Sequence, residues 1–345
     1  MNGSSSGGKP NQQSHGMHTD PLLDPSTIRL LERLSVSAKG RIRGTMQGKR
    51  RSRSLGSSLE FADFRPYVPG DDIRRIDWNV YGRSGRAFVR QYWDEQELQV
   101  HLMVDVSRSM SFDSQASLVG EPDHPARASA AAAAHHAANK LYYALQLAAS
   151  VGYTALAGED RVSAKLFANS VTGELPPLRG RGSARRLFHF LTDAWQTNRQ
   201  AQEGTAAAGS DDMYNAFMSP SSLPRLAGQT WLFTDGLYAE GMERVLSALI
   251  GARQEVVFVH LLSPAELRPD LNGELRLIDS ELKTGKDVAL GTSVIESYLR
   301  ALKQHQSDIR TLCGKCGAGY LFVDTGIPLE QTLHSIFRAA GFLRG

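Results

Sequence analysis

From Asp105 to the C-terminus the sequence alternates short apolar runs with longer helical patterns, and no other feature constrains the fold as strongly. The apolar runs of strand length after Asp105 lie at residues 161–167, 230–234, 255–262 and 320–323. The helical patterns between and after them lie at residues 126–157, 183–195, 240–253, 292–312 and 328–340. Strands and helices that alternate in this way predict an α/β fold, with a mainly parallel sheet and helices on both of its faces.

The part of the chain before this pattern has a different character. Residues 25–39 fit a short amphipathic helix, whereas residues 60–78 combine aromatic residues, prolines and charges too irregularly for a helix. We expect extended segments there, joined by a turn at Pro69-Gly70-Asp71. Trp78, which closes this stretch, is expected to be a buried anchor.

These patterns divide the chain into three parts. Residues 1–24 are polar and rich in Gly, Ser, Asn and Gln, which predicts a disordered tail. Residues 25–96 form an N-terminal region made of a short helix, a basic segment and extended β segments. Residues 97–345 form the α/β domain, in which the small, polar and proline-containing residues 197–222 predict a long insertion loop.

The composition is that of a globular protein that needs no covalent support. The chain has 345 residues, of which 41% are hydrophobic and 22% charged, enough for a core of ordinary size. No apolar run reaches the roughly 20 residues that span a bilayer, and the N-terminus contains no apolar signal-peptide core. Two cysteines do not make an extracellular disulfide framework. Together these features favour the cytoplasm.

Two further features allow a functional interpretation beside a structural one. Residues 39–53 contain seven basic residues and no acidic one, which fits a solvated segment better than a patch for nucleic acid or anionic lipid. The segment Cys313-Gly-Lys-Cys316 suggests thiol redox chemistry or half of a zinc site, but a zinc site needs four ligands and no second cysteine pair exists. The glycines around it favour the end of a helix instead.

The candidate functional residues begin where the apolar run at 96–105 ends. Asp105, Ser107 and Ser109 occupy alternate positions there. Side chains two residues apart on an extended backbone share a face, so a carboxylate and two hydroxyls are expected to converge. Hard oxygen ligands of this kind suit Mg²⁺ or Mn²⁺. The alternative is that Asp105 simply caps the following turn.

Two more residues are expected at the same edge of the sheet. Asp235 directly follows the apolar run at 230–234, and the carboxyl ends of parallel strands share an edge where ligands bind. Ser183 ends the glycine-containing loop 178–183 that precedes the third predicted helix, and we expect it to bring a further hydroxyl. Two carboxylates and three hydroxyls would leave positions open for water or for an oxygen atom of a partner.

The order of these residues resembles a known site. Asp105-x-Ser107-x-Ser109, a hydroxyl residue after a glycine-containing loop, and Phe233-Thr-Asp-Gly236 are similar to the metal-ion-dependent adhesion site of von Willebrand factor type A domains. The resemblance implies a von Willebrand factor A-like, Rossmann-like fold. In that family the middle ligand is usually Thr, whereas Ser183 stands in this sequence.

The N-terminal region narrows the resemblance to a bacterial family catalogued as domain of unknown function 58. The residues that carry this resemblance are Glu60-Phe61, Arg65-x-Tyr67, Pro69-Gly-Asp-Asp72, Arg74-Arg-Ile-Asp-Trp78, Gly82-Arg83, Ser263-Pro-Ala-Glu266 and Leu277-Ile-Asp-Ser-Glu281. The similarity spans roughly residues 28–342. Members of this family are often encoded beside MoxR-type AAA+ ATPases, so the resemblance implies such a partner and a chaperone-like or assembly role.

The sequence therefore predicts a non-enzymatic, metal-dependent module that binds a protein partner, with Mg²⁺ or Mn²⁺ held by Asp105, Ser107, Ser109, Ser183 and Asp235. The chain contains neither a P-loop nor the nucleophile elbow of an α/β hydrolase. The alternative is a Mg²⁺-dependent phosphoester hydrolase that uses the same carboxylates. Its phosphate clamp would have to come from Arg108, Arg179 and Arg181.

Overall fold

The computed structural model of the chain describes residues 22–37, 47–111, 139–202, 212–219, 221–269, 273–278, 285–290, 292–338 and 341–344. The predicted tail lies outside these residues, apart from its last three positions. The same holds for the first part of the basic segment, residues 39–46.

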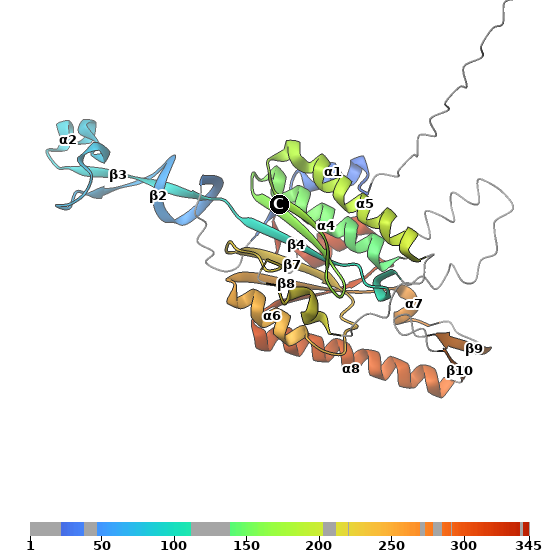
Figure 1. Cartoon of the computed structure of the whole chain (residues 1–345). Helices are drawn as coiled ribbons and strands as arrows, with labels where there is room; N and C mark the ends of the chain where they lie inside the picture. The colour runs from blue at the N-terminus through green and yellow to red at the C-terminus, as the bar shows by residue number, and fades with distance from the viewer. Residues whose placement is uncertain are drawn as a thin grey trace, which may run out of the picture.

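A six-stranded sheet forms the centre of the α/β body, in the order β11-β8-β7-β4-β5-β6 (Figure 1). Its strands are β4 (Gln99–Asp105), β5 (Arg161–Phe167), β6 (Val171–Arg179), β7 (Gly228–Thr234), β8 (Gln254–Leu262) and β11 (Gly319–Asp324). All neighbours are parallel except β5 and β6, which form an antiparallel pair. The predicted α/β fold with a mainly parallel sheet is confirmed.

Helices cover both faces of the sheet, as predicted (Figure 1). On one face lie α4 (Lys140–Ala157) and α5 (Ala184–Gln202), and on the other lie α6 (Met242–Gly251) and α8 (Thr292–Cys316). Successive side chains of β4 point to opposite faces of the sheet. Leu102 and Val104 pack into the core under α4, and Met103 packs into the core under α6. This alternation follows from the strand period of two.

Several shorter elements complete the described chain. They are α1 (Pro25–Leu31), β1 (Ser35–Val36), η2 (Ser109–Ser111), η3 (Arg181–Ser183), η4 (Met213–Phe217), α7 (Pro264–Leu267), β9 (Gly273–Ile278), β10 (Gly285–Leu290), α9 (Leu329–Thr332), the π-helical turn η5 (Leu333–Arg338) and β12 (Leu343–Arg344). None of the helices that the structure describes is long and apolar enough to cross a membrane.

Two predicted segments differ from the structure. Residues 126–138 of the helix expected over 126–157 lie outside the described residues, and α4 begins at Lys140, because Asn139 is extended and its side chain accepts a hydrogen bond from the Tyr142 amide as an N-cap. The expected insertion loop 197–222 is partly helical, since α5 continues to Gln202 and η4 follows. The apolar side chains of η4 are buried in the core under α6, which explains why this segment is ordered.

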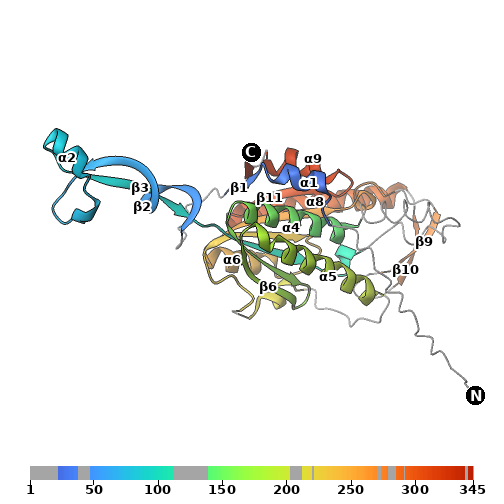
Figure 2. The ribbon, with the colours of Figure 1, turned by 90° about the horizontal axis from the view of Figure 1, so that it is seen from above.

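The two ends of the chain meet on the body, which changes the expected domain boundary. β1 pairs antiparallel with β12, and Figure 2 shows β1 close to the C-terminus. Leu31 and Val36 are buried in the core under α4, and the Gln229 amide group donates to the Ser37 carbonyl at 3.1 Å. Residues 22–37 therefore belong to the α/β body and not to a separate N-terminal region.

The remainder of the N-terminal region forms an arm that projects from the body (Figures 1 and 2). Its stem is the antiparallel pair of β2 (Gln47–Pro66) and β3 (Phe88–Gln96), and its tip carries η1 (Ile73–Arg75) and α2 (Trp78–Ser84). The expected burial of Trp78 is wrong, since 62% of this residue is exposed. Ion pairs brace the tip instead, with Arg65 2.6 Å from Asp71 and Arg90 2.8 Å from Asp77.

The cysteine pair occupies the end of a helix, as its preferred interpretation predicted. α8 ends at Cys316, Gly317 has a φ of 78°, and the Ala318 amide donates to the Cys313 carbonyl at 2.8 Å. Burial raises the pKa of the Cys313 thiol to about 12. Thiolate chemistry at neutral pH is therefore disfavoured at this position.

Candidate metal centre

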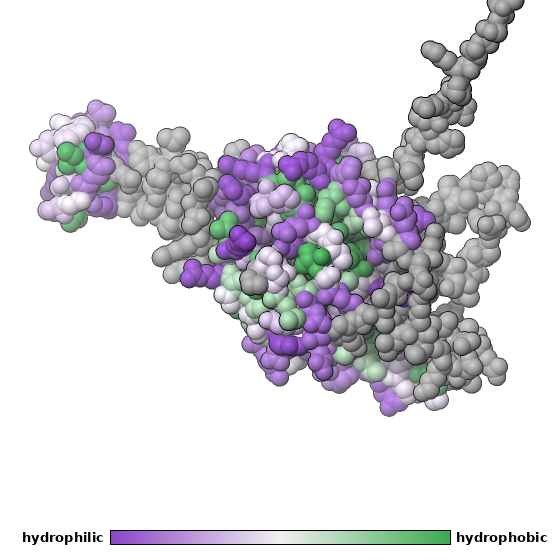
Figure 3. All heavy atoms as spheres, in the orientation of Figure 1, coloured by the Kyte–Doolittle hydropathy of each residue, from purple (hydrophilic) through white to green (hydrophobic). Residues whose placement is uncertain are grey.

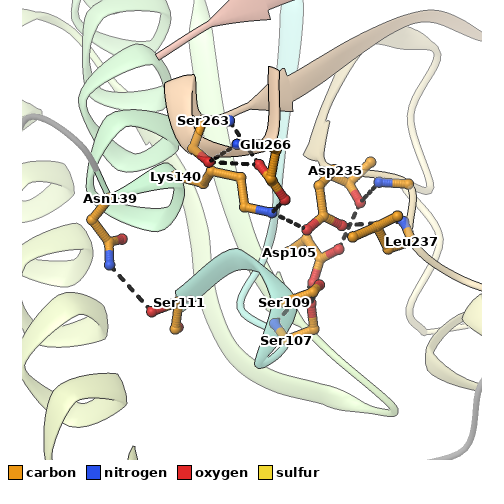
Figure 4. A network of polar contacts seen from close by, with 12 residues as sticks. Asp105, Ser107, Ser109, Ser111, Asn139, Lys140, Asp235, Leu237, Ser263 and Glu266 are labelled. Atoms are coloured by element: carbon orange, nitrogen blue, oxygen red, sulfur yellow. Dashed lines mark hydrogen bonds and ion pairs between the residues drawn. The ribbon is translucent and has the colours of Figure 1, made fainter. Parts of the chain in front are cut away.

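Asp105 ends β4 at the carboxyl edge of the sheet and is fully buried (Figure 4). Its side chain accepts hydrogen bonds from three residues. The Ser107 amide at 2.9 Å and the Tyr238 hydroxyl at 3.1 Å donate to Oδ1, and the Thr234 hydroxyl at 2.6 Å donates to Oδ2. A carboxylate oxygen has two acceptor sites, so Oδ1 is fully used and Oδ2 retains capacity for one further ligand.

The hydroxyls of Ser107 and Ser109 lie beside Asp105, as their spacing predicted. The chain turns into η2 directly after β4, and the two hydroxyl oxygens are 3.0 Å apart. Figure 4 shows both side chains next to the Asp105 carboxylate. The bond from the Ser107 amide means that Asp105 also caps this turn, so the two interpretations of the motif are compatible.

Asp235 follows β7, the strand beside β4, and lies at the same edge. Its Oδ1 accepts a hydrogen bond from the Leu237 amide at 3.1 Å, and its Oδ2 accepts one from Lys140 Nζ at 2.8 Å. The same Nζ lies 2.5 Å from Oε1 of Glu266. The side chain of Lys140 is only 1% exposed. The two predicted carboxylates are thus joined by a third, with a buried ammonium group among them (Figure 4).

A capping box fixes the position of Glu266. The amide of Ser263 at 2.7 Å and its hydroxyl at 2.8 Å both donate to Oε2 of Glu266, at the start of α7. This arrangement leaves Oε1 facing Lys140. The third carboxylate is therefore held by local backbone structure as well as by its ion pair.

Burial and neighbouring charges shift the acid–base properties of the centre. Burial, followed by the negative charge of Asp235, raises the pKa of Asp105 to about 7 from 3.8. Burial on its own would lower the pKa of Lys140, but the charges and hydrogen bonds of Asp235 and Glu266 raise it above its usual value. Lys140 therefore remains protonated at neutral pH and supplies a fixed positive charge.

Two asparagines tie the loop after β4 to the helices that cover it. Asn198 of α5 donates to the Val106 carbonyl at 3.0 Å and accepts a hydrogen bond from the Ser111 hydroxyl at 2.5 Å. Asn139, at the start of α4, donates to the Ser111 carbonyl at 3.3 Å. The loop that carries the two serine hydroxyls is thus held from both α4 and α5.

Ser183 lies at the opposite edge of the sheet, so the expectation that its hydroxyl joins this centre is wrong. Its hydroxyl donates to the Arg179 carbonyl at 2.8 Å, and Arg179 pairs with Arg161 at the start of β5. Because β6 runs antiparallel to β5, it returns the chain to the amino edge. The distance from there to the end of β4 is about the length of a seven-residue strand, roughly 20 Å.

The sequence did not predict Lys140, Tyr238 or Glu266 as part of the centre. Only Glu266 had a local signal, because the pattern Ser263-x-x-Glu266 is a capping box. That signal predicts the start of a helix and not a contact with Lys140. The other two residues reach the centre through packing of α4 and of the segment after β7, which no local pattern reports.

The oxygen atoms assembled here fit a hard divalent cation. Two carboxylates and two hydroxyls are ligand types that Mg²⁺ and Mn²⁺ take, with water completing the shell. In the part of the chain that the structure describes, no three His, Cys, Asp or Glu side chains form a metal-binding group. An ion at this place would therefore depend on the hydroxyls of Ser107 and Ser109 and on water.

The strand order and the helices on both faces define an α/β protein with a mainly parallel sheet, and an Asp-x-Ser-x-Ser turn follows its central strand β4. A family model described as "Protein of unknown function DUF58" matches residues 63–141 and 126–308. The match spans more than half of the chain, and the chain belongs to this family. The family resemblance seen in the sequence is thereby confirmed.

Similar proteins extend over most of the chain. Uncharacterized proteins of Mycobacterium bovis and Mycobacterium tuberculosis are 27% identical to it over 303 residues, covering 88% of this chain and 86% of theirs. The crystal structure of conserved hypothetical protein BatB from Bacteroides thetaiotaomicron has 12% identity and a TM-score of 0.33, covering 66% of this chain and 90% of that one. An aerotolerance-related membrane protein from Bacteroides fragilis has 16% identity and a TM-score of 0.33, covering 71% and 98%.

Proposed function

We propose that this protein is a non-enzymatic, metal-dependent protein-binding module. The observation that carries the proposal is the meeting of Asp105, Ser107, Ser109 and Asp235 at the end of two neighbouring strands. These side chains offer only oxygen ligands and come from elements fixed by the core. Mg²⁺ or Mn²⁺ bound there would present open coordination positions to an oxygen atom of a partner.

The partner that we propose is a MoxR-type AAA+ ATPase, and the role is chaperone-like or complex assembly. The basis is membership of the family, together with a centre that lacks a complete set of protein ligands. A partner carboxylate would supply a further hard oxygen ligand. Capture of the partner would then depend on the divalent cation.

Substitution of Asp105 by Asn tests this proposal. We expect the variant to lose Mg²⁺-dependent capture of the ATPase, as wild-type protein does in EDTA, because the ion loses a charged ligand. The measurement is a pull-down with purified ATPase in MgCl₂ and in EDTA. Ser183→Ala is the matched control and should capture the partner normally, because Ser183 lies at the opposite edge. Equal capture by wild type, Asp105→Asn and the EDTA-treated protein would refute the metal bridge.

The geometry does not favour the phosphoester hydrolase. Two of the arginines expected to hold phosphate lie at the other edge of the sheet, where Arg179 pairs with Glu97 and Arg181 contacts Tyr153. Only Arg108 lies on the loop beside the carboxylates. A cluster of cations around a transferred phosphoryl group is what such chemistry requires.

The tip of the arm offers a second contact surface for the same partner. No residue of α2 is buried, and Trp78 packs edge-to-face on Tyr81 with ring centroids 6.0 Å apart. Val68 and Ile73 are 57% and 61% exposed, and Figure 3 shows hydrophobic residues on the surface of this tip. Exposed Trp and Tyr beside arginines are the composition of interface hot spots.

Trp78→Ala is expected to weaken binding of the ATPase about tenfold or more. The melting temperature should not change, because Trp78 is mostly exposed. Binding is measured by biolayer interferometry with immobilised ATPase. Leu226→Ala serves as the control, since Leu226 is a 49% exposed apolar residue of the body. If both variants bind like the wild type, the tip is not part of the interface.

A further inference from the structure

The candidate centre contains a cation that belongs to the protein itself. Lys140 Nζ lies 2.8 Å from Asp235 and 2.5 Å from Glu266, and its side chain is 1% exposed. The charge of Asp105 interacts with that of Asp235, so the centre combines three carboxylates with one ammonium group that contacts two of them. A surface lysine could turn away from an incoming ion into water, but Lys140 is enclosed on all sides and has no such route.

The ammonium group and a divalent ion would interact with the same carboxylate. Lys140 occupies Oδ2 of Asp235, and the Leu237 amide occupies Oδ1. A metal held between Asp105 and Asp235 would therefore lie close to a fixed positive charge in a region without water screening. Repulsion between two positive charges, here the metal ion and the ammonium group, is strong where the local dielectric constant is low.

We propose that Lys140 is a built-in counter-cation that sets the affinity of this centre for divalent ions. It neutralises part of the carboxylate charge when no metal is bound, and it opposes the metal when one arrives. Glu266 has the reverse effect, because its negative charge offsets that of Lys140. The inference rests on the proposed metal centre and adds the residues that tune it.

The competing explanation is that Lys140 only orients Asp235 as a ligand. The two explanations predict opposite signs. If Lys140 opposes the metal, its removal strengthens metal binding. If Lys140 orients Asp235, its removal frees that carboxylate to rotate and weakens metal binding.

Three variants separate these explanations by charge alone. With all three carboxylates ionised, the wild-type centre carries a net charge of two negative units, from Asp105, Asp235 and Glu266 against Lys140. Lys140→Met makes the centre more negative by one unit with a side chain of similar length. Glu266→Gln makes it less negative by one unit, and Gln preserves the capping box with Ser263. The double variant restores the wild-type charge.

Isothermal titration of the metal-free full-length proteins with MnCl₂ and with MgCl₂ measures the outcome. We expect Lys140→Met to bind about tenfold tighter or more than wild type, and Glu266→Gln about tenfold weaker or more. The double variant should bind within a few-fold of wild type. The one acceptor oxygen of Gln can keep the capping bonds from Ser263, although it loses the bond from Lys140, so Glu266→Gln tests the proposal even if Lys140→Met does not fold.

The outcomes distinguish failure of the role of Lys140 from failure of the metal centre. Weaker metal binding by Lys140→Met, or unchanged binding by Glu266→Gln, overturns the role of Lys140 while the metal centre stands. If wild type binds no metal but Lys140→Met does, the counter-cation is supported in its strongest form, and metal-dependent binding by wild type is refuted. If no protein in the series binds either ion, both proposals are overturned.

Discussion

Replacing Lys140 by Met is expected to destabilise the metal-free protein by about 3–5 kcal/mol. The substitution leaves Asp235 and Glu266 without their shared ammonium partner, at sites that are 0% and 14% exposed at the side chain. Removal of one partner from a buried ion pair leaves an uncompensated charge, which costs more than the pair itself contributes. The free energy of unfolding in urea, measured with EDTA present, checks this expectation.

Lys165 provides a matched control for that measurement. It also forms a lysine–carboxylate pair, with Glu174 at 3.0 Å, but the Glu174 side chain is 58% exposed. Lys165→Met should therefore cost no more than about 1 kcal/mol. A similar small cost for Lys140→Met would contradict the idea that its ammonium group carries the charge balance of the centre. MgCl₂ should restore part of the stability of Lys140→Met, because the ion replaces the missing positive charge.

Asp105→Asn should gain stability relative to wild type as the pH rises. In the metal-free folded protein the pKa of Asp105 is raised to about 7 by burial and by Asp235, from 3.8. The folded state therefore binds a proton that the unfolded state releases between about pH 4 and pH 7, and stability from this group falls as the pH rises through that window. A shift of this size corresponds to about 4 kcal/mol. Asn has no proton to lose and imitates the protonated acid.

The comparison between variant and wild type separates this effect from that of two histidines, whose contribution to stability depends on pH in the opposite direction. Burial lowers the pKa values of His101 and His260 to about 4 from 6.5, so stability from these residues is lost as the pH falls below 6.5. Their contribution is the same in both proteins and cancels in the difference. Urea unfolding of both proteins at several pH values between about 4 and 8 gives the result. A difference that does not change with pH would mean that Asp105 stays ionised throughout.

The strands and the two aspartates could be predicted because their signals are local. Residues 161–167 form β5 as expected, and the predicted strand at 230–234 lies within β7. Asp105 and Asp235 each follow a buried apolar strand, and parallel strands place such residues at one edge. The family signature could be read from short motifs for the same reason.

Predictions failed where the place of a residue depended on the direction of its strand or on contacts with distant parts of the chain. Ser183 has the right residue type and a glycine-containing loop before it, but the antiparallel course of β6 places it at the other edge. Trp78 has the composition of a buried anchor, yet it lies on an arm with little around it.

The sequence by itself determined the α/β class, the family and the Asp-x-Ser-x-Ser turn at the end of a central strand, because strand periodicity and short motifs are local properties. Only the tertiary structure decided the charge of the centre. Lys140 and Glu266 come from separate helices and meet Asp235 through packing of those helices at the carboxyl edge of the sheet. A buried charge acquires its partners from such packing, and no spacing in the sequence records it.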